Sequence, residues 1–402
     1  MNYGWEHLEV NGLFPFMCSE KSMNNKTLFK LHGWVGLFAF LPLLVICVTG
    51  SVLVFKYELE NIIRPHMVTV TESERRLELD TLKDSVNQQF KHHEIVGWVL
   101  FQDRQRADVV YLMPKGTDDW RHIYLDPFDG GILSSPAKKD DFLSDWLLEL
   151  HANFLLEDSG LVITTVYSLL LIILGISGLM LYKKFWKSLF KIRWQAKRIL
   201  LFSDLHKQVG FFSAPIFLVL GITGGYWNIA HLLHEYEHHA SGDSFVMQDR
   251  LYNDALSIDD LQRRAHHALA NFKSTYITFP YEEDMHFTFY GDVSAGNPLS
   301  SEYASSVTFH RHTGEHMASY DIRTAPMLNV FLDTFRPLHF GLFAGMPIRV
   351  LWCVAGLMPL ILSFTGVYMW LLRRSKKRAK QLRLQKRAAA QEVTGEANPL
   401  SI

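Results

Sequence analysis

Four histidines occupy repeated positions in the sequence and could bind a metal. Each follows a leucine, in the pairs at residues 31–32, 150–151, 205–206 and 338–339. Neutral imidazole is the commonest metal ligand in proteins. Each of these histidines lies close to a long apolar segment, where a polar side chain is costly unless it is paired, hydrated or bound. A hydrogen bond to the backbone or to a lipid headgroup would explain one such histidine, but the fourfold repetition favours a shared ligand.

A duplication in the chain indicates which of these histidines are equivalent. The segments that resemble each other are 27–51 with 201–225, and 142–160 with 331–347. The first match makes His32 the counterpart of His206. The second makes His151 the counterpart of His339. We therefore predict a duplicated unit that consists of a span, an outer segment, a short Leu-His segment and a second span.

Four segments are long and apolar enough to cross a membrane. Each lacks Asp, Glu, Lys and Arg, and they cover residues 33–55, 160–182, 209–230 and 350–372. An α-helix needs about 20 apolar residues to cross the hydrocarbon core, and a helix in a soluble core is rarely uncharged on every face for that length. We therefore predict a membrane α-helical fold in which four transmembrane helices form a duplicated two-helix unit.

Basic residues indicate how these helices are oriented. Seven Lys and Arg but no acidic residue lie in 183–198, and six more follow the fourth span in 373–380. The positive-inside rule places both segments and both termini in the cytoplasm, and residues 58–159 and 231–349 outside. A basic run beside a span is better explained as an anchor at the lipid surface than as a nucleic-acid site. We predict a multi-pass protein of the bacterial inner membrane.

Other kinds of protein are disfavoured by what the sequence lacks. Cys18, Cys47 and Cys353 are too few and too scattered for a disulfide framework, a zinc knuckle or covalent haem attachment. Motifs for hydrolysis, ATP binding and dinucleotide binding are missing. No charged residue lies at mid-depth in a span, which counts against a coupled transporter. We expect no cleavable signal peptide, and Met23 is as ordinary a start as Met1.

The equivalent histidines are suited to binding haem. His32 and His206 open the first and third spans at the cytoplasmic end, so their imidazoles could lie on opposite faces of one flat macrocycle. His151 and His339 could do the same near the outer face. Iron with two imidazole ligands has no open site, which suits electron transfer rather than oxygen binding. Two non-covalent haems, one near each face, would give electrons a path through the membrane.

Further histidines follow the third span. His231, His234 and His238 have helical spacing, and His239 stands beside them. His231 or His234 could replace one of the predicted outer ligands. Alternatively, the group could form a landing site for a metal ion.

The two outer segments have matching patterns. Each starts with a helical stretch, at 79–90 and 258–272, and continues with the alternation that is typical of strands. Each then contains a hairpin, at 123–133 and 307–317. We predict two small α+β domains packed on the outer membrane face. A solvated hairpin explains three further histidines better than a metal site, because the first hairpin has other residues in their places: His310, His312 and His316.

The sequence resembles the PepSY-associated transmembrane family over most of residues 27–375. The motifs that carry the resemblance are LHGWVGLFAFLPLLVICVTGSVLVF from Leu31, LHANFLL from Leu150, LHKQVGFF from Leu205, and the hairpins with DPFDGG and HTGEH. The subgroup that the chain most resembles contains iron-regulated inner-membrane ferric-siderophore reductases with two b-type haems. After His339 the sequence departs from the family pattern, with two glycines and Pro347.

This resemblance implies roles for particular residues. It implies two PepSY-like outer domains and two haem b groups whose iron is bound by His32, His206, His151 and His339, without fixing how the four pair. Ferric siderophore would be reduced outside the membrane to release its iron, with a quinol or a cytoplasmic reductase as electron donor, and no separate catalytic residue is assigned. Two other functions stay open: a non-enzymatic PepSY-type module that binds or regulates an outer partner, and a siderophore permease.

The predicted organisation follows the order of these segments. It comprises a cytoplasmic N-terminal segment (1–30), a first span (31–57), a first PepSY-like domain (58–141), a helix on the periplasmic face (142–159), a second span (160–182), a basic cytoplasmic loop (183–205), a third span (206–231), a second PepSY-like domain (232–330), a periplasmic-face segment (331–347), a fourth span (348–372) and a basic cytoplasmic tail (373–402).

Overall fold

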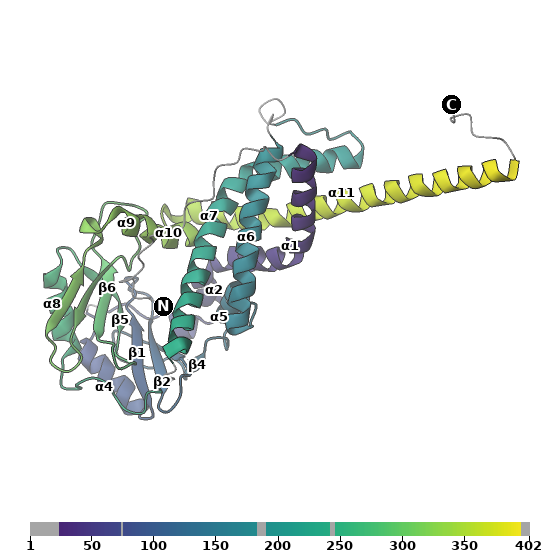
Figure 1. The fold of residues 1–402 in the computed structure, drawn as a ribbon. Coiled ribbons are helices and arrows are strands. Elements are labelled where there is room, and N and C mark those ends of the chain that lie inside the picture. Colours follow the sequence, from purple (N-terminus) through teal and green to yellow (C-terminus); the bar gives the residue numbers. More distant parts are fainter. Residues whose placement is uncertain (1–23, 74, 183–189, 242–245, 395–402) are drawn as a thin grey trace. The chain divides into compact units, whose positions relative to one another are not determined.

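Two compact units make up the protein. The computed structural model describes residues 24–73, 75–182, 190–241 and 246–394. Of these described residues, the first unit contains 24–47, 167–182, 190–221 and 355–394, and the second contains 48–73, 75–166, 222–241 and 246–354. Most of the predicted N-terminal segment and part of the basic loop lie outside the described residues. Four long helices contribute to both units (Figure 1): α1 (Asn25–Leu53), α6 (Glu157–Leu181), α7 (Arg198–Ser241) and α11 (Gly345–Thr394).

The long helices confirm the four predicted spans. Each contains a stretch that is long and apolar enough to cross a membrane. All four start before their predicted limits. Two extend furthest: α7 covers 198–241 where 206–231 was predicted, and α11 covers 345–394 where 348–372 was predicted. The residues added to α11 are rich in Lys, Arg, Gln, Leu and Ala, and those added to α7 are rich in Leu. These residue types favour helix, so the helices continue past their apolar parts.

Small residues bring the helices of the first unit close together. A Cβ atom placed on Gly36 would lie 3.6 Å from Leu174 Cδ2, and one placed on Gly210 would lie 3.6 Å from Leu362 Cδ2. A Cβ atom placed on Gly175 would lie 3.0 Å from Leu218 Cδ2 of α7. Glycine at these places lets a large side chain of the neighbouring helix approach the backbone, which is how helices commonly pack in membranes.

The second unit is built on one antiparallel sheet of eight strands. The strand order is β4-β3-β2-β1-β5-β6-β7-β8. Their bounds are β1 (His93–Val99), β2 (Asp108–Pro114), β3 (Arg121–Leu125), β4 (Ala137–Lys138), β5 (Lys273–Thr278), β6 (Phe287–Asp292), β7 (Ser305–Phe309) and β8 (His316–Tyr320).

This single sheet corrects the prediction of two separate small domains. Each outer segment supplies four strands, and the two sets join where β1 pairs with β5, with Gly97 opposite Thr278 and Val99 opposite Tyr276. An unpaired strand edge exposes backbone N–H and C=O groups that seek partners. Pairing the two edges with each other satisfies these groups and merges the two segments into one body.

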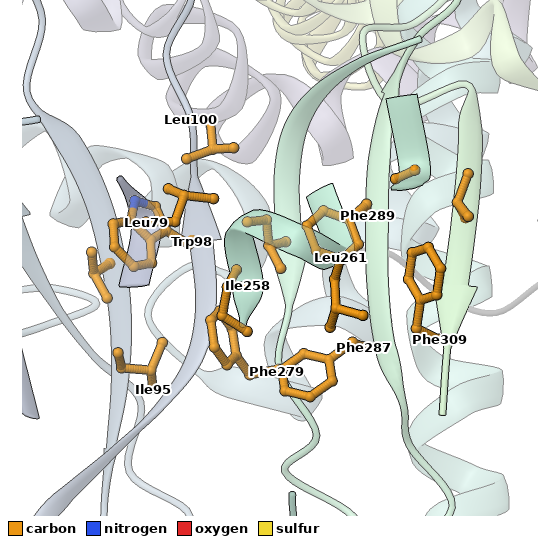
Figure 2. Close-up of a cluster of buried hydrophobic side chains, with 14 of the residues drawn as sticks. Leu79, Ile95, Trp98, Leu100, Ile258, Leu261, Phe279, Phe287, Phe289 and Phe309 are labelled. Atoms are coloured by element: carbon orange, nitrogen blue, oxygen red, sulfur yellow. The ribbon is translucent and has the colours of Figure 1, made fainter. Parts of the chain in front are cut away.

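Two helices cover one face of the sheet and close a shared core. They are α4 (Leu79–Gln89) and α8 (Ile258–Ala268), as predicted from the two helical stretches. Figure 2 shows side chains of both strand sets meeting there, with Trp98 from β1 and Phe289 from β6 fully buried. The helix starts cap each other: Asp259 accepts from the backbone N–H of Leu79 at 2.8 Å, and Asp80 accepts from that of Ile258 at 2.8 Å. The two helix starts therefore make equivalent contacts.

Short helices connect the sheet to the long helices. They are α2 (Lys56–Ile63), α3 (Pro65–Val68), α5 (Leu143–Asn153), α9 (Met327–Asp333) and α10 (Phe335–Phe340), with a 3₁₀ turn η2 (Ile322–Thr324) before α9. The predicted helix 142–159 is in fact interrupted, because the chain turns through the left-handed residues Phe154 and Leu155 between α5 and α6. Two of these short helices, α5 and α10, carry His151 and His339.

Candidate haem-binding histidine pairs

The first unit brings His32 of α1 and His206 of α7 together. Their ring centres lie 6.3 Å apart, and the ring planes are almost perpendicular, at 89°. Both rings are half-buried. The duplication had made these two residues equivalent in sequence, and the structure makes them neighbours in space.

Hydroxyl groups on the other two helices hold this pair. His32 Nδ1 lies 2.8 Å from Ser177 Oγ of α6, and His206 Nδ1 lies 2.9 Å from Thr365 Oγ1 of α11. The Thr365 hydroxyl donates its one hydrogen to the carbonyl of Ile361 at 2.7 Å, so the histidine must donate to the oxygen. With the hydrogen on Nδ1, a metal would bind at Nε2.

The second unit brings His151 of α5 and His339 of α10 together in the same way. Their ring centres lie 6.2 Å apart, with 61° between the planes. His151 Nδ1 is 3.3 Å from Thr49 Oγ1, and His339 Nδ1 is 2.8 Å from Thr223 Oγ1. Burial, and next the neighbouring His151, lower the pKa of His339 to about 3. The imidazole is therefore neutral, which is the form that binds metals.

A hydroxyl residue followed by glycine contacts each of the four histidines. The dipeptides are Thr49-Gly50, Ser177-Gly178, Thr223-Gly224 and Thr365-Gly366, one in each span. A Cβ atom on these glycines would lie 2.7, 3.4, 3.1 and 3.4 Å, respectively, from the histidine Cε1 atom. The hydroxyl orients the ring, and the glycine leaves room for it. The sequence signal that could have indicated this role is the Ser/Thr-Gly dipeptide that recurs in every span.

Two histidines at this spacing fit a metal held between them. With a metal–nitrogen bond of about 2 Å and an imidazole ring radius of roughly 1.2 Å, two rings on opposite sides of one metal have centres about 6.4 Å apart. The observed separations are 6.3 and 6.2 Å. Among the described residues no group of three or more His, Cys, Asp or Glu could hold a metal ion, so two axial ligands are what each pair offers.

Two buried N–H donors lie close in sequence to residues of the pairs. Gln208 Nε2, two residues after His206, and Trp227 Nε1, three residues after Gly224, have no hydrogen-bond partner in the described part of the protein. Leaving a buried donor unpaired costs about 1–3 kcal/mol. A ligand with carboxylate groups, as haem has, could supply the missing acceptors.

Buried charges fix the start of α5. Asp145 of α5 lies 2.8 Å from Lys56 Nζ and 3.5 Å from Arg64 Nη2. Glu60, whose side chain is 1% exposed, joins them by ion pairs with Lys56 at 2.8 Å, with Arg64 at 3.1 Å and with Arg106. Burial alone would raise the pKa of Glu60, but Lys56 and Arg106 outweigh it and lower this pKa to about 2. This network ties the helix of His151 to α2 and the sheet.

Arg336 holds α10 in place by contacts with the second unit's loop before β7. Arg336, three residues before His339, pairs with Glu302 at 2.8 Å. Its guanidinium carbon lies 4.6 Å from the ring centre of Tyr303 and 5.1 Å from that of Phe340. Salt bridging and stacking together hold this short helix against the β6–β7 connection.

The alternative histidines have different surroundings. The structure pairs His339 with His151. His231 lies on α7 after Thr223, and this pair is complete without it. The side chain of His234 lies outside the described residues. His310 and His312 lie beside the β7–β8 hairpin with ring centres 5.9 Å apart, and His316 starts β8. Among the described residues no group of three or more His, Cys, Asp or Glu that could hold a metal ion includes these hairpin histidines.

The fold and the paired histidines define a membrane protein with four candidate spans and two facing imidazole pairs. The chain belongs to the family of the PepSY-associated TM region, which matches residues 29–373. That match covers all four histidines, both strand sets and the four spans. No curated protein matches the chain.

Proposed function

We propose that this protein binds two b-type haems and carries electrons across the membrane to reduce a ferric siderophore on the outer side. The observation that carries the proposal is the spacing of the two histidine pairs, 6.3 and 6.2 Å between ring centres. Lipid-facing or hydrated histidines would have no reason to adopt this separation twice. The wider resemblance to iron-regulated reductases of this family supports the choice of substrate.

The residues around each pair have defined tasks in this proposal. His32 and His206 would hold one haem iron, and His151 and His339 the other. A haem bound by two imidazoles accepts and releases one electron and leaves no site for oxygen. The hydroxyls on Nδ1 fix the ring orientation and make Nε2 the ligand atom. Axial ligation through neutral histidines needs no covalent attachment, which agrees with the scattered cysteines.

The positions along the spans support transport of charge from one face to the other. In α1, His32 lies near the start and Thr49, which contacts His151, lies near the end. In α7, His206 and Thr223 are separated by the same 17 positions, although α7 continues for 18 residues past Thr223. The basic segments put the His32–His206 pair on the cytoplasmic side by the positive-inside rule. Electrons would therefore enter at this pair and leave at the His151–His339 pair.

Reduction would release iron because of ligand preference. Siderophores bind Fe(III) through hard oxygen donors, and Fe(II) is a softer ion that such donors bind less well. The half-buried side chains of Thr288 and Tyr290 on β6 and of Ser306 and Thr308 on β7 offer polar groups for such a chelate. The quinol or cytoplasmic reductase that supplies electrons lies on the opposite side in this scheme.

Spectroscopy of the purified protein tests the proposal directly. We expect a red preparation with about two haems per chain and a b-type Soret band that dithionite shifts. Addition of a ferric siderophore to the reduced protein should reoxidise the haem and produce Fe(II), trapped by a ferrous chelator. A colourless protein that still binds an outer protein partner would favour the non-enzymatic module. Uptake of intact chelate into vesicles without Fe(II) formation would favour a permease.

A further inference from the structure

The last part of α11 forms a basic arm, which we define as residues 373–394. Nine Lys and Arg and no acidic residue lie between Arg373 and Arg387. Every side chain from 373 to 390 is exposed. The arm continues the helix of the fourth span without a break, so it is a rigid extension of that span.

The arm starts close to the first histidine pair. Thr365, which contacts His206, lies eight residues before Arg373 in the same helix, or about 12 Å along the axis at 1.5 Å per residue. The guanidinium carbon of Arg373 lies 4.8 Å from the ring centre of Phe29 on α1, and Phe29 is one turn of helix before His32. A small protein domain, about 30 Å across, that lies along the arm from its base to Arg387 is thus near the pair where electrons would enter.

The far end of the arm lies beyond the reach of lipid charge. Arg387 is fifteen residues past Leu372, which corresponds to about 22 Å along a helix. Even with a span tilt of about 40° this leaves roughly 17 Å between Arg387 and the membrane edge. Surface charges are screened over about 8 Å at physiological salt. Anchoring to anionic lipid explains Arg373 and Arg374, but it accounts less well for the distal cations Arg383, Lys386 and Arg387.

The chemistry of the arm suits a protein surface. Leu382 and Leu384 are 57% and 54% exposed among the cations. Protein–protein interfaces combine apolar contacts with charge complementarity, and the charges mainly increase the rate and specificity of association. A phosphate backbone has no use for the two exposed leucines, and the arm contains no aromatic residue for stacking on bases.

We propose that the basic arm docks a soluble, acidic one-electron carrier protein and holds it beside the His32–His206 pair. This inference rests on the proposed function and specifies its electron donor as a protein rather than a quinol. In each encounter the carrier loses one electron and the membrane protein gains it. Long-range attraction between the arm and an acidic carrier would raise the association rate, and that gain falls as salt screens the charges.

A charge-reversal variant tests the arm in the full-length protein. The probe is a plant-type [2Fe–2S] ferredoxin, an acidic carrier, added to protein in nanodiscs of neutral lipid, with binding followed by calorimetry. For the triple variant Arg383→Glu, Lys386→Glu and Arg387→Glu we expect at least tenfold weaker binding and a much flatter dependence on salt. Ferredoxin-driven reduction of the protein should slow by a similar factor, while reduction by dithionite stays unchanged.

A matched control changes the same number of exposed cations elsewhere. Lys91, Arg263 and Lys273 are exposed residues of the second unit, and reversing all three to Glu gives the same change in net charge. This control should bind the probe as the wild type does. Equal binding by the arm variant and the wild type would overturn the proposal. So would wild-type binding to anionic vesicles or to duplex DNA that exceeds ferredoxin binding and is lost in the arm variant.

The binding measurement separates this inference from the proposed function. Calorimetry detects the ferredoxin whether or not the membrane protein contains haem. A protein with two haems and no affinity for the probe would overturn the arm proposal alone. A colourless protein would overturn the proposed function, and with it the donor role of any carrier that the arm still binds.

Discussion

The two histidine pairs reach nearly the same spacing by different means. In the first unit both histidines lie on long helices and are held by hydroxyls of neighbouring long helices. In the second unit both lie on short helices, α5 and α10, which are fixed by ion pairs of Asp145 and Arg336. A long helix is stabilised by its many backbone hydrogen bonds and so holds its side chains in place. A helix of six or eleven residues has few such bonds and needs tertiary contacts to stay in place.

The glycines beside the pairs show the same contrast. A Cβ atom would lie 3.4 Å from the histidine at Gly178 and Gly366, which the ring could accommodate by a small shift. At Gly50 it would lie 2.7 Å away, closer than side-chain atoms approach without rearrangement. The second pair is thus packed more tightly against backbone and has less room to adjust than the first.

Removing a ligand should have the largest effect and should separate the two pairs. His206→Ala and His151→Ala should each lower haem content from two to one per chain, because one imidazole rarely retains a b haem in a six-coordinate state. The remaining haem would then report the spectrum and potential of the untouched pair. His267→Ala, on an exposed residue of α8, is the control. Loss of both haems in either variant would mean that the pairs are not independent.

A single methyl group should disturb the second pair more than the first. Gly50→Ala pushes a Cβ atom into the His151 ring, so we expect loss of one haem or a high-spin, five-coordinate spectrum. Gly366→Ala should keep both haems with a slight spectral shift. Gly33→Ala, with no atom within 4 Å of the new Cβ, controls for the general stabilisation of a helix by alanine. Equal haem loss at Gly50 and Gly366 would contradict the difference in packing.

Breaking the charge network should weaken the second unit. Glu60→Gln leaves Lys56, Arg64 and Arg106 without their central carboxylate, and removing one partner of a buried ion pair costs about 3–5 kcal/mol. We expect a clearly lower melting temperature of the second unit, measured by circular dichroism in detergent. Glu78→Gln removes a carboxylate from a pair with Arg75 whose side chains are 49% and 82% exposed, so it should change stability by less than about 1 kcal/mol.

The pH dependence gives a second measure of the same network. Because the pKa of Glu60 is lowered from 4.5 to about 2 in the folded protein, its stabilising contribution is complete above pH 4.5 and is lost as pH falls towards 2. Glu60→Gln should remove this part of the acid sensitivity. An unchanged slope of stability against pH between these values would show that other carboxylates dominate.

The sequence was enough to predict the spans and the equivalence of the histidines. Absence of charge over about 20 residues leaves few alternatives to a span, and the duplication relates His32 to His206 without any structure. The hydroxyl partners could not be found in this way. Ser177 contacts a histidine 145 positions earlier in the chain, and only knowledge of which helices are neighbours connects the two.

The sheet shows why long-range pairing escapes sequence reasoning. Periodicity predicted strands in both outer segments, but the β1–β5 pairing joins residues about 180 positions apart and has no local signal. In the first predicted hairpin the returning arm is not a full strand. An isolated bridge links Leu125 and Ile132, with backbone hydrogen bonds from Asp126 N–H to the Gly131 carbonyl and from Leu133 N–H to the Tyr124 carbonyl, each 2.8 Å. There Ser134 Oγ accepts the Tyr124 N–H at 3.0 Å, so a side chain takes the place that a second strand was expected to fill.

The smallest effect should come from the hydroxyls, and it should differ within the second pair. Thr223→Val keeps the shape of the side chain but removes the acceptor 2.8 Å from His339 Nδ1, whereas Thr49→Val removes a longer contact of 3.3 Å to His151. Partners of metal-binding histidines typically contribute about 10–100-fold in affinity, so Thr223→Val should speed haem transfer to a haem-free acceptor protein by roughly that factor.

Thr49→Val should have a smaller effect on that transfer rate. A hydrogen bond weakens as it lengthens, and the charge network around Asp145 keeps α5 in place without the hydroxyl. Thr49→Ser and Thr223→Ser, which retain an acceptor, serve as controls and should behave like the wild type. A larger effect at Thr49 than at Thr223 would show that the hydroxyl, rather than the network of buried charges, orients His151.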